Sequence, residues 1–314
     1  MSFKRKSAMF YHAIRTTVKT FNMLNKGQDY CYNILQTAHR LEKGMTIRNP
    51  KALWGFEKAE ALAALLYKEK NKENKDAFAV KTGEAVLAAY IAYKENSDSE
   101  EEIKRVSLLK ENIGKYNLDL NLDAKAGGVL SVEKSDMIFE DGKIEDLFNK
   151  RHSIRDFSDT PVSEEEIKKA IDLASGAPSA CNRQPTKVYV INSDQRKAAG
   201  ANDDYYADKY LILSGCISAF SITEFNDWIV NASIFAGYLI LAFQSLGLGA
   251  CVCRKSLVAP SKYNNNIRKL CNIPDNEQIV LEIAIGNYKD GNTVPVSNRK
   301  KSEDIIVFAN SKNQ

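Results

Sequence analysis

The chain changes character near its middle, and this change limits the folds that it can adopt. From residue 10 to about residue 113 it reads as successive helices, rich in Ala, Leu, Lys and Glu, with a single proline, Pro50. The clearest predicted helices span residues 29–41, 51–70 and 77–93. Later, helical patterns alternate with β-branched or aliphatic runs at residues 187–191, 210–213 and 279–286. The sequence therefore predicts an α+β fold preceded by an all-helical N-terminal region.

A connecting segment separates these two parts. Between residues 116 and 142 the helical periodicity fades, and Gly127 and Gly128 stand among scattered polar residues. A chain of 314 residues is long enough for two units that each bury a core, at about 150 residues per domain. We expect a helical domain over residues 1–140 and a second domain over residues 141–314.

Composition narrows the classes of partner. The 44 basic and 40 acidic residues leave a net charge of +4, which is too small to indicate a nucleic-acid partner. The six cysteines show neither a disulfide framework nor zinc spacing, and we expect Cys251 and Cys253 to be small buried residues rather than metal ligands. The longest apolar stretch, residues 229–243, is shorter than the roughly 20 residues that a membrane span needs. These features predict no metal site, no membrane span and a cytoplasmic location.

One helix of the second half has well-defined ends. Ser163 and Glu166 form a capping box, and Gly176 with Pro178 ends the pattern, so a helix is predicted over residues 164–175. A longer, apolar helix is predicted over residues 227–246, ending at Gly247, and its composition suggests burial at a subunit or domain interface.

The segment before the capped helix holds two cations around a hydroxyl. Alternate side chains of an extended segment share a face, so Arg151, Ser153 and Arg155 would project together. Guanidinium groups bind phosphate oxygens in bidentate fashion, which favours an anionic ligand. The alternative is a surface loop with two solvated arginines.

The segment after the same helix reads Pro-Ser-Ala-Cys-Asn-Arg-Gln-Pro, residues 178–185. Small residues and two prolines let the backbone approach a flat ligand, and the amides of Asn182 and Gln184 offer donors and acceptors. Ordinary loop chemistry explains the segment equally well.

Together, these two segments resemble the signature of the FMN-dependent nitroreductase family, an Arg-x-Ser-x-Arg-x-Phe start and a Pro-Ser-x-x-Asn-x-Gln-Pro loop. The Leu-Gly-Leu-Gly turn at residues 246–249, and Gly286 followed by Arg299, also resemble family segments. The resemblance covers roughly residues 144–308. It implies a homodimer with a central, mainly antiparallel sheet flanked by helices and one FMN at each of two sites in the subunit interface.

The resemblance also implies roles for individual residues. Arg151, Ser153 and Arg299 would hold the phosphate, and Arg155 would approach the pyrimidine side of the flavin. Pro178, Ser179 and Asn182 would come from the other subunit and cover the ring and ribityl chain. Backbone amides of residues 252–254 would lie near flavin N5. The predicted cofactor-binding residues are Arg151, His152, Ser153, Arg155, Pro178, Ser179, Ala180, Asn182, Gln184, Val252, Cys253, Arg254 and Arg299.

The implied function is an FMN-dependent oxidoreductase that passes hydride from NAD(P)H to a small organic acceptor, of nitroaromatic or quinone type in vitro. Gly247-x-Gly249 lacks the third glycine of a dinucleotide fingerprint, so the nicotinamide would bind only transiently over the flavin. The sequence departs from the family at Thr186, where an aromatic residue is common. The region between residues 213 and 227 is short in this chain, and relatives often carry lid helices at the corresponding place. We hypothesise that the N-terminal helical domain replaces this lid.

Two N-terminal features have open interpretations. Residues 39–44 resemble a segment of nitroreductase-like proteins associated with bacterial polysaccharide biosynthesis. They read as a charged helix end with Gly44 as its stop, although His39 near a flavin could donate a proton to a reduced substrate. The first 26 residues are basic, contain no acid and have apolar residues at near-helical spacing. We expect a helix packed on its own protein, with an anionic membrane surface as the alternative.

Two other functional classes stay open. The fold could serve as a non-catalytic flavin-binding or assembly protein of a polysaccharide pathway, with the helical domain contacting partners. A helical interaction protein without flavin is the third class, and it predicts a colourless protein.

Overall fold

The computed structural model describes residues 3–46, 53–121, 126–129, 143–201, 207–253, 261–289 and 301–309. Its α-helices are α1 (Phe3–Leu24), α2 (Tyr30–Met45), α3 (Phe56–Lys70), α4 (Ala77–Glu95), α5 (Glu100–Gly114), α6 (Lys143–Lys150), α7 (Glu164–Ala174), α8 (Ser193–Ala198), α9 (Asp227–Ser245) and α10 (Lys262–Leu270). Short 3-10 turns include η2 (Ala180–Asn182), η3 (Ile217–Ala219), η4 (Ile222–Glu224) and η6 (Ser302–Asp304). The strands are β1 (Thr186–Asn192), β2 (Lys209–Cys216), β3 (Leu248–Cys253) and β4 (Glu277–Asn287).

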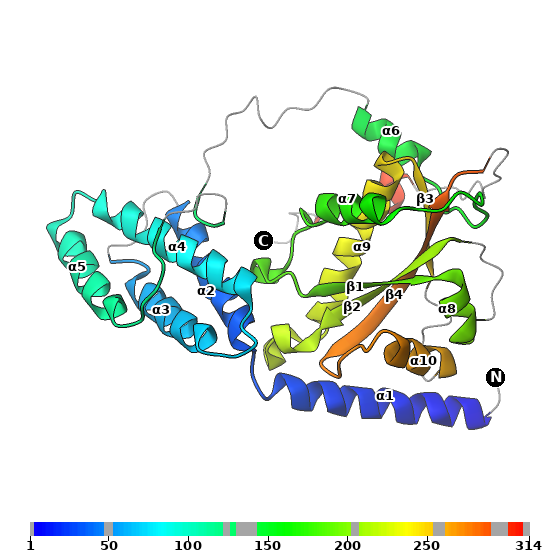
Figure 1. The fold of residues 1–314 in the computed structure, drawn as a ribbon, viewed down its shortest axis with the longest axis horizontal. Coiled ribbons are helices and arrows are strands. Elements are labelled where there is room, and N and C mark those ends of the chain that lie inside the picture. Colours follow the sequence, from blue (N-terminus) through cyan, green and yellow to red (C-terminus); the bar gives the residue numbers. More distant parts are fainter. Residues whose placement is uncertain are drawn as a thin grey trace.

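The four strands form one antiparallel sheet in the order β1-β2-β4-β3, which places β1 and β3 at opposite edges (Figure 1). Side chains of β2 alternate between two apolar clusters, with Leu211 and Leu213 on one face and Tyr210 and Ile212 on the other. The α+β fold with a mainly antiparallel sheet is confirmed. The three predicted strands are present, whereas β3 had no strand prediction.

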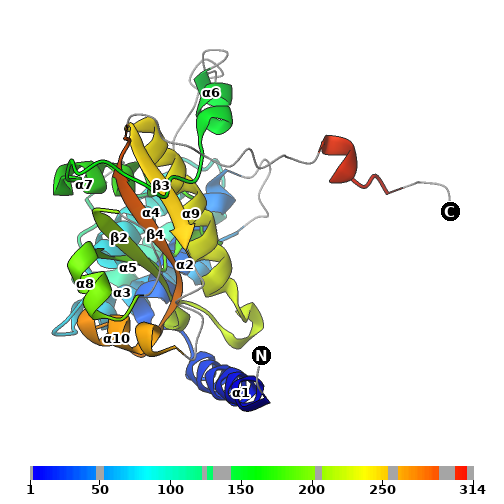
Figure 2. The same ribbon diagram turned by 90° about the vertical axis from the view of Figure 1, so that its right-hand side faces the viewer.

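Helices cover both faces of this sheet (Figure 2). The first apolar cluster joins the sheet to α7 and α9, and the second joins it to α10. The capping box of α7 is present, with the Ser163 hydroxyl accepting from the Glu166 amide and the Glu166 carboxylate accepting from the Ser163 amide. α7 and α9 lie within one residue of their predicted ends.

The apolar helix α9 is half core and half surface. It is the one described helix whose length and composition would suit a membrane span, yet it packs along the sheet through Ala232, Leu239 and Phe243. Its opposite side exposes Val230, Ile234 and Tyr238, which follow one another at intervals of four residues. These three residues form one apolar stripe on the helix surface.

The N-terminal helices α2 to α5 pack around a core of their own, seen at the left of Figure 1. Leu62, Leu66, Leu87 and Leu109 are completely buried in it. Helix α3 begins at Phe56, later than predicted, and residues 51 and 52 of the predicted helix lie outside the described residues. The boundary predicted near residue 140 also lies outside them and stays a prediction.

The interpretation of Gly44 as the helix stop is wrong. Helix α2 continues through Gly44 to Met45. A Cβ at Gly44 would lie 1.7 Å from atoms of the Trp54 ring, so the residue allows close packing rather than a left-handed turn.

Helix α1 packs on its own protein through its last turns. Leu24 belongs to the apolar cluster between the sheet and α9, and Lys19 forms an ion pair of 2.8 Å with Asp275. Phe10 and Tyr11, by contrast, are about two-thirds exposed. The last turns of α1 therefore anchor it to the C-terminal half.

Candidate functional site

The segment with the two arginines lies extended along the free edge of β3. Ser153 forms a parallel bridge with Ala250, and the Ile154 amide donates to the Ala250 carbonyl at 3.1 Å. Ile154 and Phe157 are buried beside two glycines of the sheet. A Cβ at Gly249 would lie 3.0 Å from Ile154, and one at Gly286 would lie 2.7 Å from Phe157. The missing side chains therefore make room for this segment.

Polar groups gather on this edge. Arg151, His152 and Ser153 are half-buried, whereas Arg155 is exposed and donates from Nη1 to the Ser153 carbonyl at 3.2 Å. Because the Ala250 carbonyl faces away from β4, the Val252 amide two residues later faces the same free edge. Successive amides of a strand point in opposite directions, so the Cys253 amide faces β4. We call Arg151, Ser153, Arg155 and the Val252 amide the β3-edge group.

The second predicted segment, residues 178–185, leads into β1 at the opposite edge of the sheet, and we call it the β1-edge loop. Pro178, Asn182 and Gln184 are exposed, while Ser179 and Ala180 are half-buried. The Gln184 amide donates to the Ser179 hydroxyl at 3.0 Å. The loop thus presents amide groups and a proline ring to the outside.

A cavity of about 280 Å³ lies beside this loop, between α7, β1 and α9. Pro178, Ser179 and Gln184 line it together with apolar side chains that include Phe235. Its volume lies below the roughly 300 to 1,000 Å³ of typical cofactor pockets. This cavity alone does not enclose a cofactor of flavin size.

The structure keeps the two predicted groups apart within one chain. Three strand spacings separate the β3 edge from the β1 edge, a distance of about 14 Å. Among the described residues, no hydrogen bond joins the β3-edge group to the β1-edge loop. The two predicted groups therefore do not form one continuous site within a single chain.

Sequence reasoning missed Arg183, which holds the β1-edge loop from inside. Its side chain is buried, with Nε donating to the Ala180 carbonyl at 2.9 Å and Nη1 to the Ala219 carbonyl at 2.7 Å. Nη1 and Nη2 also bind the Glu224 carboxylate. The hydrogen bond from Arg183 lowers the pKa of Glu224 to about 2. The Ser221-x-x-Glu224 capping pattern was a local signal for this carboxylate.

Helix α2 contacts the same loop from outside. It packs against η2, and Gln36 Nε2 lies 4.0 Å from Cys181 Sγ. His39 stands one turn further along α2, half-buried, with Nδ1 3.3 Å from Glu42 Oε2. The other Glu42 oxygen accepts from the Gly128 amide at 3.1 Å. The helical region thus reaches the loop, and the hypothesis that it replaces the lid stays a prediction.

Other predicted residues lie elsewhere. Arg254 and Arg299 fall outside the described residues. Cys251 and Cys253 are buried as predicted, and the Cys253 thiol donates to the Cys251 carbonyl at 3.4 Å. The neighbouring Cys251 side chain and burial both raise the pKa of Cys253. Within the described part of the chain, no three His, Cys, Asp or Glu side chains gather as metal ligands would.

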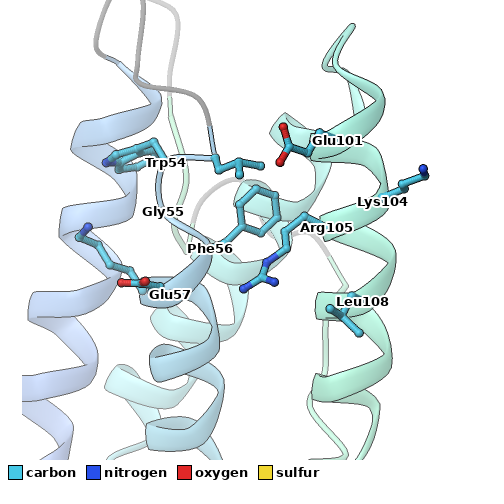
Figure 3. A pocket seen from close by; sticks show the side chains of 10 residues that line it. Trp54, Gly55, Phe56, Glu57, Glu101, Lys104, Arg105 and Leu108 are labelled. Carbon is cyan, nitrogen blue, oxygen red and sulfur yellow. The ribbon is translucent and has the colours of Figure 1, made fainter.

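A roomier cavity of about 690 Å³ lies in the helical region, between the start of α3 and α5 (Figure 3). Glu101 and Arg105 point toward Phe56, while Lys104 points away. Arg105 also approaches Glu60 at 3.7 Å. This cavity holds none of the predicted site residues.

Comparison with known proteins addresses the C-terminal half. A sequence model described as "Nitroreductase family" matches residues 149–212 and 223–287. A Streptococcus pyogenes protein with an NAD(P)H nitroreductase name is 42% identical over 57 residues, which are 18% of this chain and 28% of that protein. An iodotyrosine deiodinase of Haliscomenobacter hydrossis is 24% identical over 214 residues, 56% of this chain and 92% of the relative.

An FMN-dependent nitroreductase from Clostridium difficile has a TM-score of 0.43 and 23% identity, over 52% of this chain and 98% of that protein. The matches to curated relatives are uneven, since the chain spans little more than a quarter of the streptococcal protein. Helices α1 to α5 lie outside the match to the family, which begins at residue 149. The C-terminal half of the chain, with its α+β fold, belongs to the nitroreductase family.

Proposed function

We propose that this protein is an FMN-dependent oxidoreductase that accepts hydride from NADH or NADPH and passes reducing equivalents to a small organic acceptor. The observation that carries the proposal is the division of the site. One edge of the sheet offers cations, a hydroxyl and a backbone amide that faces away from β4, and the other offers a polar loop. Two copies related by a twofold axis would bring the β3-edge group of one against the β1-edge loop of the other.

The residues fit the chemistry of FMN. Arg151 and Ser153 suit the phosphate, since guanidinium and hydroxyl groups donate to its oxygens. The Val252 amide and the amide side chains of the β1-edge loop suit the hydrogen-bonding edge of the ring. When bound, FMN supplies the transfer of hydride from nicotinamide to the acceptor.

The chain's own residues would tune and complete this chemistry. Arg155 places a positive charge at the β3 edge, where it would stabilise negative charge on the pyrimidine side of the ring. His39 holds Nδ1 toward Glu42, so Nε2 is the atom that would give a proton to the acceptor. Pro178 would exclude water from one face of the ring.

The exposed stripe of α9 supports the dimer. Val230, Ile234 and Tyr238 are 52%, 38% and 44% exposed on a helix whose other side is core. Burial of such a stripe against a second copy stabilises association through the hydrophobic effect. Sedimentation of the purified protein as a monomer at micromolar concentration would contradict this part of the proposal.

The decisive experiment is flavin binding followed by reduction. Purified protein incubated with FMN and desalted should be yellow, bleach with NADH or NADPH, and regain colour with an acceptor. The acceptor panel should include a nitroaromatic, a quinone and iodotyrosine, because the relatives carry nitroreductase and iodotyrosine deiodinase names. Bound flavin inert to both nucleotides would instead support the non-catalytic alternative, a flavin-binding or assembly protein of a polysaccharide pathway. Colourless protein would refute both.

The role of His39 needs a separate test. In His39→Gln, FMN affinity and bleaching by the nucleotide should persist while reoxidation by a proton-requiring acceptor slows. Arg40→Gln, on the exposed side of the same helix turn, serves as the control. Unchanged reoxidation in His39→Gln would reject the proton donor.

A further inference from the structure

The β1-edge loop is held in a conformation that two of its residues, Cys181 and Gln184, do not favour. Cys181, Asn182 and Gln184 all have left-handed backbone angles, with φ of 51°, 51° and 49°. Asparagine tolerates this region, whereas cysteine and glutamine adopt it rarely and persist in it only when the surrounding structure imposes it. The loop therefore depends on its supports.

Arg183 is the internal support. Its guanidinium is 4.7 Å from the centre of the Phe220 ring and bonds to the loop itself through the Ala180 carbonyl. Its remaining donors reach out of the loop, to the Ala219 carbonyl and to Glu224. The position of the Ala219 carbonyl therefore helps to set the position of the Arg183 guanidinium, and through it the position of the loop.

The N-terminal region fixes Ala219 in turn. Gln28, at the junction of α1 and α2, donates from Nε2 to the Ala219 carbonyl at 2.9 Å. The same oxygen accepts from Arg183, and a carbonyl has two lone pairs for such a pair of donors. Next to it, the Asp29 amide donates to the Ser218 carbonyl at 3.2 Å, and the Ser218 hydroxyl donates to Asp29 at 2.7 Å.

We infer that the junction of α1 and α2 positions the β1-edge loop through Ala219 and Arg183, so that the helical region is a structural part of the flavin site. Gln28 and Arg183 are positioning residues in this arrangement, since neither is expected to touch the flavin. The inference rests on the proposed function only for its consequence in FMN binding. The chain of contacts itself stands without any ligand.

Removal of the junction contact should loosen the loop. Gln28→Ala in the full chain deletes one hydrogen bond to Ala219, and we expect FMN affinity to fall about fivefold. Arg183→Lys keeps the charge but cannot hold Ala180, Ala219 and Glu224 together, and we expect a loss of at least tenfold. Asn25→Ala is the matched control, because Asn25 is exposed on the same junction and its side chain has no described partner.

Hydrogen exchange gives a readout that needs no flavin. Amides of residues 182–184 should exchange faster in Gln28→Ala and Arg183→Lys than in the parent, while those of β4 stay unchanged. The double variant should lose less FMN affinity than the product of the two single losses, because both act through Ala219. Faster exchange throughout β4 would mark general destabilisation and would overturn the positioning role.

The two proposals fail in distinguishable ways. If the parent protein binds no FMN, the proposed function fails, and loop exchange alone decides the positioning role. If the parent binds FMN and Gln28→Ala matches it in affinity and in exchange at residues 182–184, the positioning role is refuted while the proposed function stands.

Discussion

The two edges of the sheet hold their predicted site residues by different means. At the β3 edge, backbone pairing with Ala250 and close packing against Gly249 and Gly286 fix the segment. None of residues 151–157 has a positive φ. At the β1 edge, a loop with three left-handed residues is held by a buried guanidinium that donates to the Ala180 and Ala219 carbonyls.

This difference teaches how each edge should respond to change. A support made of packing is sensitive to volume and insensitive to pH, because no titrating group takes part. A support made of an ion pair is sensitive to the charge of its carboxylate. Variants that change volume should therefore disturb the β3 edge, and acid should disturb the β1 edge.

The largest effect is expected from Gly286→Ala. Its Cβ would lie 2.7 to 2.8 Å from three atoms of the buried Phe157 ring and Cβ, so the segment must shift. We expect a loss of about 3 kcal/mol in the free energy of unfolding, measured with urea. Gly237→Ala in α9, where a Cβ meets nothing within 4 Å, is the control and should cost nothing. Equal stability of both variants would show that packing does not hold this edge.

Arg151→Ala tests the polar side of the same edge. Loss of charge-assisted bonds to the phosphate should weaken FMN binding about 30-fold, or about 2 kcal/mol, without a change in urea stability. Lys150→Ala is the control, since Lys150 is exposed and paired with Asp146 at 2.6 Å. Fluorescence titration checks both. Equal weakening in the two variants would point to general electrostatic attraction instead.

Acid should act on the β1 edge through Glu224. Its pKa falls from 4.5 to about 2 on folding, so its carboxylate stabilises the folded state above pH 4.5 and loses this effect as the pH falls toward 2. Between pH 5 and pH 3 the Tm of the parent should fall about 3 °C further than that of Glu224→Gln. Calorimetry across this range measures the difference. Parallel falls in both proteins would show that another carboxylate is responsible.

Local patterns predicted the local features. The Ser163 capping box depends on residues three positions apart, and the apolar runs of β1, β2 and β4 carry their own strand preference. The two predicted site segments were chosen from side-chain chemistry together with their resemblance to the nitroreductase signature, and their role in a site stays a prediction. Strand β3 was missed because Leu-Gly-Ala-Cys-Val-Cys has little strand preference, and pairing with β4 makes it a strand.

Features that depend on distant partners were beyond sequence patterns. Arg183 reads as a solvated loop residue until Glu224, 41 residues later, and Ala219 surround it. Gln28 meets Ala219 across 191 residues. Gly44 was expected to end its helix because glycine often does so. Its actual role, making room for the ring of Trp54, depends on tertiary packing that the local sequence does not show.

The smallest expected effect concerns the strain in the β1-edge loop itself. Cys181→Asn replaces a residue at φ 51° with one that tolerates the left-handed region, and should raise the free energy of unfolding by up to about 1 kcal/mol. FMN affinity should stay within twofold, because Arg183 already fixes the conformation of the loop and lower backbone strain would not change that conformation. Urea unfolding and flavin titration on the same sample test both statements. A marked gain in FMN affinity would mean that the loop samples other conformations despite Arg183, and the contrast between a packed edge and a bonded edge would then become one between a rigid edge and a mobile one.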